Sequence, residues 1–184
     1  MPSAVAITIA IGFVVNQLGL PLYLDTVGTV LTSALAGPVA GLLVGVVSQA
    51  VRSLYEGFIW LPFALVQVVI AILAAVAASR RGFRSVPVTI LWGLVVGLVA
   101  GAVSAVISYF VFQGVTATGV TAVTIFLTRL GLTRAQAVTV SSLGTDLLDK
   151  TIVFALVGAT LRTLPVRVLT RFDWARRATA QSVR

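Results

Sequence analysis

The sequence predicts an all-α integral membrane protein with six transmembrane helices. Three observations lead to this fold class: 59% of the 184 residues are hydrophobic, only 10% are charged, and the mean hydropathy is +1.10. Soluble domains carry about 25% charged residues. We expect a six-helix membrane domain over residues 1–164 and a basic cytoplasmic tail over residues 165–184.

The first three spans are expected at the start of the chain, in close succession. Ser3 to Leu20 is apolar with polar residues only near its end. Leu22 to Ala36 covers about 22 Å as a helix, less than the roughly 30 Å of hydrocarbon, so it must tilt or pack against protein. Gly37 and Pro38 predict a tight turn into the third span, Pro38 to Tyr55.

The remaining spans are separated by basic or threonine-rich segments. We expect a fourth span over Leu61 to Ser79, a fifth over Val86 to Phe112 and a sixth over Leu132 to Leu164. Gly114 to Leu130 is short, and we expect a re-entrant or surface segment there. Glycines recur every fourth residue at 37, 41 and 45 and at 93, 97 and 101, which lets neighbouring helices approach closely.

The distribution of arginine predicts the orientation. Nine of the 13 basic residues lie in two groups separated by two spans: Arg80, Arg81, Arg84, Arg162, Arg167, Arg171, Arg176, Arg177 and Arg184. Basic residues accumulate in cytoplasmic loops, so both groups and both chain termini are expected in the cytoplasm. Three loops then face outward, over residues 16–25, 52–60 and 113–134.

Polar and aromatic residues gather in the outer loops and on one face of the sixth helix. Ionisable groups inside a bilayer are costly unless they are paired or face a wet cavity, and they therefore indicate a functional site. Spacings of three and four place the candidates of the sixth helix on one face. The candidate substrate-binding residues are Asn16, Gln17, Tyr23, Asp25, Arg52, Tyr55, Glu56, Trp60, Gln67, Ser142, Asp146, Asp149 and Lys150.

Each candidate also has a structural interpretation, which the sequence leaves open. Asp146 and Lys150 are spaced to form an ion pair that stabilises the helix, and Arg52 and Glu56 are spaced to pair in a solvated loop. Asp25 is placed to cap the second helix. Tyr55 and Trp60 are typical of an interfacial aromatic belt, and Gln67 is typical of a hydrogen bond between helices.

The composition excludes most catalytic chemistry. The chain has no histidine and no cysteine, and its few acids do not complete an oxygen-rich metal site, so we expect no metal, no cofactor and no catalytic residue. The net charge of +8 does not indicate nucleic acid, because the arginines flank apolar segments.

Several segments together resemble the substrate-binding S components of energy-coupling factor (ECF) transporters. They are LDTVGTVLTSALAGPVAGLLVGVVSQAV, LPFALVQVVIAILAA, the Arg-Arg-Gly boundary that follows, and DKTIVFALVGATLRTLP. The resemblance covers nearly the whole chain. Its most specific parts are the block from Leu24 to Ala50 and Asp149, Lys150 and Thr151.

The resemblance implies a binding subunit of an ABC importer in the bacterial cytoplasmic membrane. Such a subunit captures a vitamin or related micronutrient at the outer face and delivers it inward with a transmembrane coupling protein and two cytoplasmic ATPases. Family members dock on the coupling protein through a small-residue AxxxA pattern in the first helix, which Ala6 and Ala10 match. The vitamin itself is not specified.

Two other classes of function remain as alternatives. A structural or assembly membrane protein would use the polar groups only to hold helices together and would bind no small ligand. An intramembrane enzyme would be built around Asp146 and Asp149, and the lack of further acids and of histidine argues against it.

Overall fold

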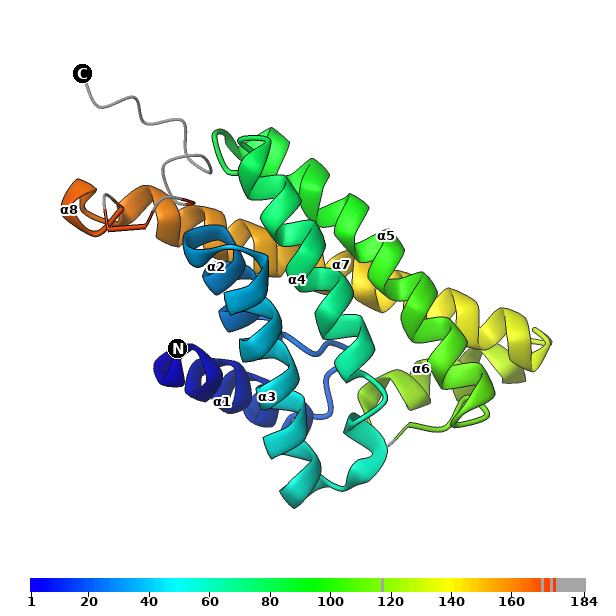
Figure 1. Cartoon of the computed structure of the whole chain (residues 1–184). Coiled ribbons are helices and arrows are strands. Elements are labelled where there is room, and N and C mark those ends of the chain that lie inside the picture. Colours follow the sequence, from blue (N-terminus) through cyan, green and yellow to red (C-terminus); the bar gives the residue numbers. More distant parts are fainter. Residues whose placement is uncertain (117, 170, 173, 175–184) are drawn as a thin grey trace.

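A computed structural model describes residues 1–116, 118–169, 171, 172 and 174, and in this part of the chain every regular element is helical (Figure 1). The elements are α1 (Pro2–Gln17), α2 (Val27–Ala36), α3 (Pro38–Glu56), the 3-10 turn η1 (Phe58–Trp60), α4 (Ala64–Ser79), α5 (Val86–Phe110), α6 (Gly119–Arg129), α7 (Arg134–Thr163) and α8 (Val166–Leu169). The predicted all-α class is confirmed.

Two of the helices are long and apolar enough by themselves to cross a membrane. They are α3, with 19 residues, and α5, with 25 residues, and they match the predicted third and fifth spans. The shorter apolar helices α1, α2 and α4 lie where the first, second and fourth spans were predicted. Helix α7 has 30 residues and carries the charged residues of the predicted sixth span.

Helix α2 begins five residues later than the sequence predicted. Leu22 lies outside the helix, and the first helical residue is Val27. The backbone N–H groups of Tyr23 and Leu24 donate to the Asp149 carboxylate on α7, and Leu24 has a left-handed φ of 46°. This contact holds the preceding residues in a loop, so α2 is only about 15 Å long.

The predicted Gly-Pro turn joins α2 to α3. Gly37 has a φ of 90°, which favours glycine, and Pro38 occupies the first turn of α3. The indole of Trp174 lies against this turn, because a methyl group added at Gly37 would stand 2.7 Å from its Nε1 atom. The turn is thus covered by a residue near the end of the described chain.

The glycine strip on α5 packs directly on α7. A methyl group added at Gly97 would lie 2.7 Å from the carbonyl oxygen of Asp146 and 2.8 Å from Cα of Leu147. Gly93 and Gly101 meet the α7 backbone near Thr151 and Leu143 in the same way. The two helices therefore pack backbone to backbone, and this contact sets the height of Asp146 beside α5.

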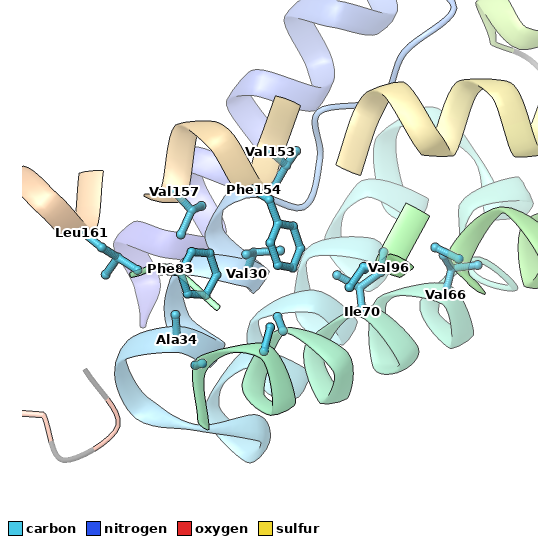
Figure 2. Packing of buried hydrophobic residues seen from close by; sticks show 14 of the residues in the cluster. Val30, Ala34, Val66, Ile70, Phe83, Val96, Val153, Phe154, Val157 and Leu161 are labelled. Atoms are coloured by element: carbon cyan, nitrogen blue, oxygen red, sulfur yellow. The ribbon is translucent and has the colours of Figure 1, made fainter. Parts of the chain in front are cut away.

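An apolar core joins α2, α4, α5 and α7 (Figure 2). Val30, Ile70 and Val96 are fully buried within it. Phe83, in the turn between α4 and α5, stacks on Phe154 of α7 with ring centroids 5.4 Å apart. The core extends from the polar region around Asp146 to the α4–α5 turn.

The segment between α5 and α7 is a loop followed by a short helix. Helix α6 has 11 residues, about 16 Å, which is too short to cross a bilayer alone. It is held on α7 by a hydrogen bond of 2.7 Å between the hydroxyls of Thr124 and Ser141. Thr133 caps α7 in a reciprocal arrangement with Gln136. Most of the predicted tail lies outside the described residues.

Candidate functional site

A buried cavity lies where the α1–α2 loop, η1, α3, α4, α5 and α7 meet. Its volume is about 20 Å³, which holds little more than one water molecule. The lining residues are Tyr23, Asp25, Thr26, Gln49, Trp60, Phe63, Val66, Gln67, Ile70, Ser104, Asp146 and Lys150. One side of the cavity is aromatic and another carries hydrogen-bonding and charged groups.

Arg52 of α3 anchors the first polar network. Its Nη1 atom lies 3.0 Å from Oδ2 of Asp25, and its Nε atom lies 2.6 Å from Oε2 of Glu56. The Gln49 amide donates to the same Asp25 oxygen at 3.2 Å. The Arg52 side chain is only 3% exposed, so the pair with Glu56 is buried and the solvated-loop interpretation was wrong.

Asp25 and Gln67 connect α2, α3 and α4. Asp25 does not cap α2, as the structural interpretation supposed: Thr26 is the N-cap, and the first-turn amide of Gly28 donates to the Thr8 hydroxyl of α1. The Gln67 amide donates to the Asp25 carbonyl at 3.1 Å and accepts from the Thr29 hydroxyl at 2.8 Å. Gln67 therefore makes the predicted hydrogen bond between helices and also lines the cavity.

Three charged residues of α7 form the second polar network. Lys150 Nζ lies 3.4 Å from Oδ1 of Asp146 and makes a closer contact with Asp149. The predicted pair of Asp146 with Lys150 is thus present. All three side chains are at most 2% exposed. Removing one partner from such a buried pair leaves an uncompensated charge, which is strongly destabilising.

Three buried oxygen atoms on residues lining the cavity have no hydrogen-bond partner among the described residues. They are Thr26 Oγ1, Gln49 Oε1 and Asp146 Oδ2. A buried polar atom without a partner costs about 1–3 kcal/mol, and such atoms are rare in folded proteins. These atoms therefore offer acceptors for N–H or O–H groups of a ligand or of water.

Aromatic rings form the other wall. Tyr23 and Trp60 meet edge to face at 6.4 Å, and Trp60 lies 6.2 Å from Phe63. Phe63 stacks on Phe112 at 5.7 Å. Burial, followed by the nearby Asp146 carboxylate, raises the pKa of the Tyr23 hydroxyl. Tyr23 therefore presents a neutral hydroxyl at physiological pH.

A narrow crevice, too small to hold a water molecule, adjoins the aromatic wall. It shares Tyr23, Trp60 and Phe63 with the first cavity and is also lined by Ile59, Thr116 and Thr118. The residues after α5 thus lie over the same aromatic rings as the α1–α2 loop. Two loops far apart in the sequence cover one side of the site.

The structure separates the predicted site residues into three groups. Those that line the cavity are Tyr23, Asp25, Trp60, Gln67, Asp146 and Lys150. Those that hold a lining residue or the α1–α2 loop in place without lining the cavity are Arg52, Glu56 and Asp149. Those that lie away from the cavity lining are Asn16, Gln17, Tyr55 and Ser142.

The four residues away from the lining differ in their surroundings. Gln17 is exposed at the end of α1, and Asn16 is half-buried. Tyr55 is 47% exposed and meets the edge of the Phe13 ring. Ser142 is buried on α7, one turn before Asp146.

Sequence reasoning missed half of the lining. Gln49 precedes Arg52 by three residues and so shares its helix face, which is a signal that could have identified it. Thr26 and Ser104 are small polar residues of a kind common in membrane helices. Phe63, Val66 and Ile70 carry no signal, because apolar residues are frequent throughout the chain.

The small residues predicted to meet a partner lie on the surface of α1. Ala6 and Ala10 are both exposed. Ala6 also borders an apolar groove of about 570 Å³ between α1 and α3, which Ile9, Leu43 and Val47 line with other apolar residues.

Residues 3–153 match the family model described as "ECF-type riboflavin transporter, S component". The match covers both polar networks and the whole cavity lining. No curated protein and no solved structure gives a significant match to the chain.

Proposed function

We propose that this chain, which belongs to the family of ECF-type riboflavin transporter S components, binds a flavin-type vitamin in the cavity around Trp60 and Asp146. Membership of the family makes the chain a substrate-binding subunit of a transporter. The identity of the vitamin is our proposal, and it depends on the chemistry of the cavity.

The observation that carries the proposal is the pairing of an aromatic wall with unused hydrogen-bond acceptors. Tyr23, Trp60 and Phe63 offer ring surfaces to a planar ligand. Gln49 Oε1 and Asp146 Oδ2 are buried acceptors without partners among the described residues. A flavin has a planar ring, N–H and carbonyl groups at one edge, and a polyol chain rich in hydroxyls, so it matches both features.

The size of the cavity indicates that the ligand enters by displacing a loop. Sites for small molecules usually measure about 300–1,000 Å³, whereas this cavity, at about 20 Å³, holds little more than one water molecule. Its walls include Tyr23 and Asp25 of the α1–α2 loop. Outward movement of that loop enlarges the cavity while α5 and α7 keep their close packing.

The proposed transport cycle uses six spans: α1, α2, α3, α4, α5 and α7. Arg162 of α7 donates to the Phe83 carbonyl in the α4–α5 turn at 3.4 Å, which supports placing both arginine groups at one end, the cytoplasmic one. We place the α1–α2 loop, which lines the cavity, at the other end. A coupling protein docks on α1 at Ala6 and Ala10, and its ATPases supply the energy for inward delivery.

The proposal is tested by riboflavin binding to the purified chain in detergent or nanodiscs. We expect quenching of riboflavin fluorescence with submicromolar affinity, about −8 kcal/mol or better, and no binding of thiamine, biotin, pantothenate or cobalamin. D146N should weaken binding about tenfold or more, because a hydrogen bond to a charged group contributes about 1.5–3 kcal/mol. S142A, on the same helix but away from the cavity lining, should bind normally.

Two results would decide against the proposal. Tight binding of another vitamin would agree with a transporter subunit but would show that the ligand is not a flavin. A folded chain that binds no member of the panel would favour a structural role for the two polar networks.

A further inference from the structure

Lys150 joins a carboxylate at the cavity to a carboxylate outside it. Its ammonium group contacts Asp146, which lines the cavity, and Asp149, which does not. Both acids are almost completely buried, with 1% and 0% of their surface exposed. The two contacts place a single positive charge between a ligand-facing group and a group that faces the α1–α2 loop.

The second carboxylate is occupied by the backbone of the α1–α2 loop. Asp149 Oδ1 accepts hydrogen bonds from the N–H groups of Tyr23 at 2.9 Å and Leu24 at 2.6 Å. Hydrogen bonds to an ionised carboxylate are about twice as strong as neutral ones. Loop and helix are more than 120 residues apart in the sequence, so these bonds tie two distant parts of the chain together.

The loop conformation at this contact is one that a leucine rarely adopts. Leu24 has a φ of 46°, and such a residue persists only where its surroundings hold it. On either side of it stand Tyr23 and Asp25, which both line the cavity. Release of the two hydrogen bonds would let the loop relax and would remove two walls of the site together.

We infer that Asp149 is a latch that holds the α1–α2 loop closed over the cavity, and that Lys150 positions this latch. Lys150 pairs with Asp149 and orients its carboxylate, with one oxygen toward the ammonium group and the other toward the loop. Asp149 is therefore a positioning residue and makes no contact with the ligand. The role of the latch in ligand exchange rests on the proposed function, whereas loop closure is a property of the free protein.

The latch is tested first without any ligand, by hydrogen exchange of backbone amides in residues 18–26. In the wild-type chain the amides of Tyr23 and Leu24 should be the best protected of the loop. D149N, which keeps the size of the side chain but not its charge, should speed their exchange about tenfold or more. D146N removes a charge from the same network but none from the loop, and it should leave this exchange unchanged.

D149N and D146N should also differ in the rates at which riboflavin binds and dissociates. D149N should raise the dissociation rate of riboflavin more than tenfold, with a smaller rise in the association rate, because the closed loop retains the ligand. K150R should retain most of the slow dissociation. D146N should weaken binding while the loop amides stay protected.

The outcomes distinguish this inference from the proposed function. The latch inference is wrong if the amides of residues 18–26 exchange equally fast in D149N and D146N. It is also wrong if both variants exchange at the wild-type rate. If the loop amides exchange slowly only when Asp149 is present, and the protein binds no riboflavin, the latch inference stands and the proposed flavin ligand is wrong. If D149N does not fold, uniform exchange across residues 18–26 of the wild-type chain would itself overturn the inference, and selective protection of Tyr23 and Leu24 would support it.

Discussion

The guanidinium group of Arg52 lies over the indole ring of Trp60, with Cζ 3.4 Å from the ring centroid. The two residues come from α3 and η1 and are 3% and 4% exposed. Cation–π contacts of desolvated groups contribute about 2 kcal/mol or more. The same arginine pairs with Asp25 and Glu56, so one side chain fixes an aromatic wall and an acidic wall of the cavity.

Substitution of Arg52 should affect both stability and binding. R52A leaves Asp25 and Glu56 without a counter-charge, and we expect it to lower the free energy of unfolding by about 3–5 kcal/mol. R52K keeps the charge but cannot bond two carboxylates with a planar fork, so it should fold and bind riboflavin about tenfold more weakly. Denaturant titration and fluorescence quenching measure these effects. R129K, at an exposed arginine of α6, is the control, and equal effects of R52K and R129K would contradict the prediction.

Close packing of α5 on α7 predicts a difference between two glycine substitutions. G97A places a methyl group 2.8 Å from Cα of Leu147, and overpacking of this kind costs about 1–3 kcal/mol. G144A adds a methyl group where no atom lies within 4 Å, and alanine favours the helix by about 0.8–1.0 kcal/mol. Thermal unfolding followed by tryptophan fluorescence should show a lower Tm for G97A only. An unchanged Tm in G97A would mean that the α5–α7 contact is looser than described.

Two glutamines predicted to bind substrate should behave differently. Q67M removes the partner of the Thr29 hydroxyl and of the Asp25 carbonyl, each at a cost of about 1–3 kcal/mol, and takes a polar group from the cavity. Q17M changes an exposed side chain away from the cavity lining. Riboflavin titration and denaturant unfolding should show losses for Q67M and wild-type values for Q17M. A loss of binding in Q17M would restore Gln17 as a substrate contact.

The proposed orientation is testable because the chain has no cysteine. A single cysteine at Arg129, on α6, should react with a membrane-impermeant maleimide added to intact cells. A cysteine at Arg81, in the α4–α5 turn, should react only after the membrane is opened. The reverse pattern would invert the topology, and labelling of both sites in intact cells would contradict a cytoplasmic α4–α5 turn.

The sequence predicted the candidate site best where charged residues interrupt an apolar helix. Asp146, Asp149 and Lys150 stand in an apolar helix, so their common face and the pairing of Asp146 with Lys150 could be predicted from spacing. The contact of Lys150 with its neighbour Asp149 was not predicted. Their separate roles could not be predicted. Asp149 does not line the cavity and instead bonds the α1–α2 loop, in contacts with residues more than 120 positions away that no local sequence pattern indicates.

The sequence also did not show which side of α1 faces the rest of the protein. Its buried side is set by close contacts with other segments: Thr8 accepts from the Gly28 amide, and a methyl group at Gly12 would lie 2.9 Å from Cβ of Asp25. With this side facing inward, Asn16 and Gln17 remain away from the cavity lining. The late start of α2 has a similar cause, because the loop before it is held by α7.

Burial of the acids in the site leaves the surface of the described residues with charge of one sign. Among the described residues Asp25, Glu56, Asp146 and Asp149 are buried or half-buried, whereas Arg80, Arg81, Arg84, Arg129, Arg134, Arg162, Arg167 and Arg171 are exposed. Arginine does not titrate below about pH 12, so the charge of these exposed groups is constant across the physiological pH range. Attraction of this part of the chain to anionic lipid headgroups should therefore respond to ionic strength, through screening, and hardly to acidification.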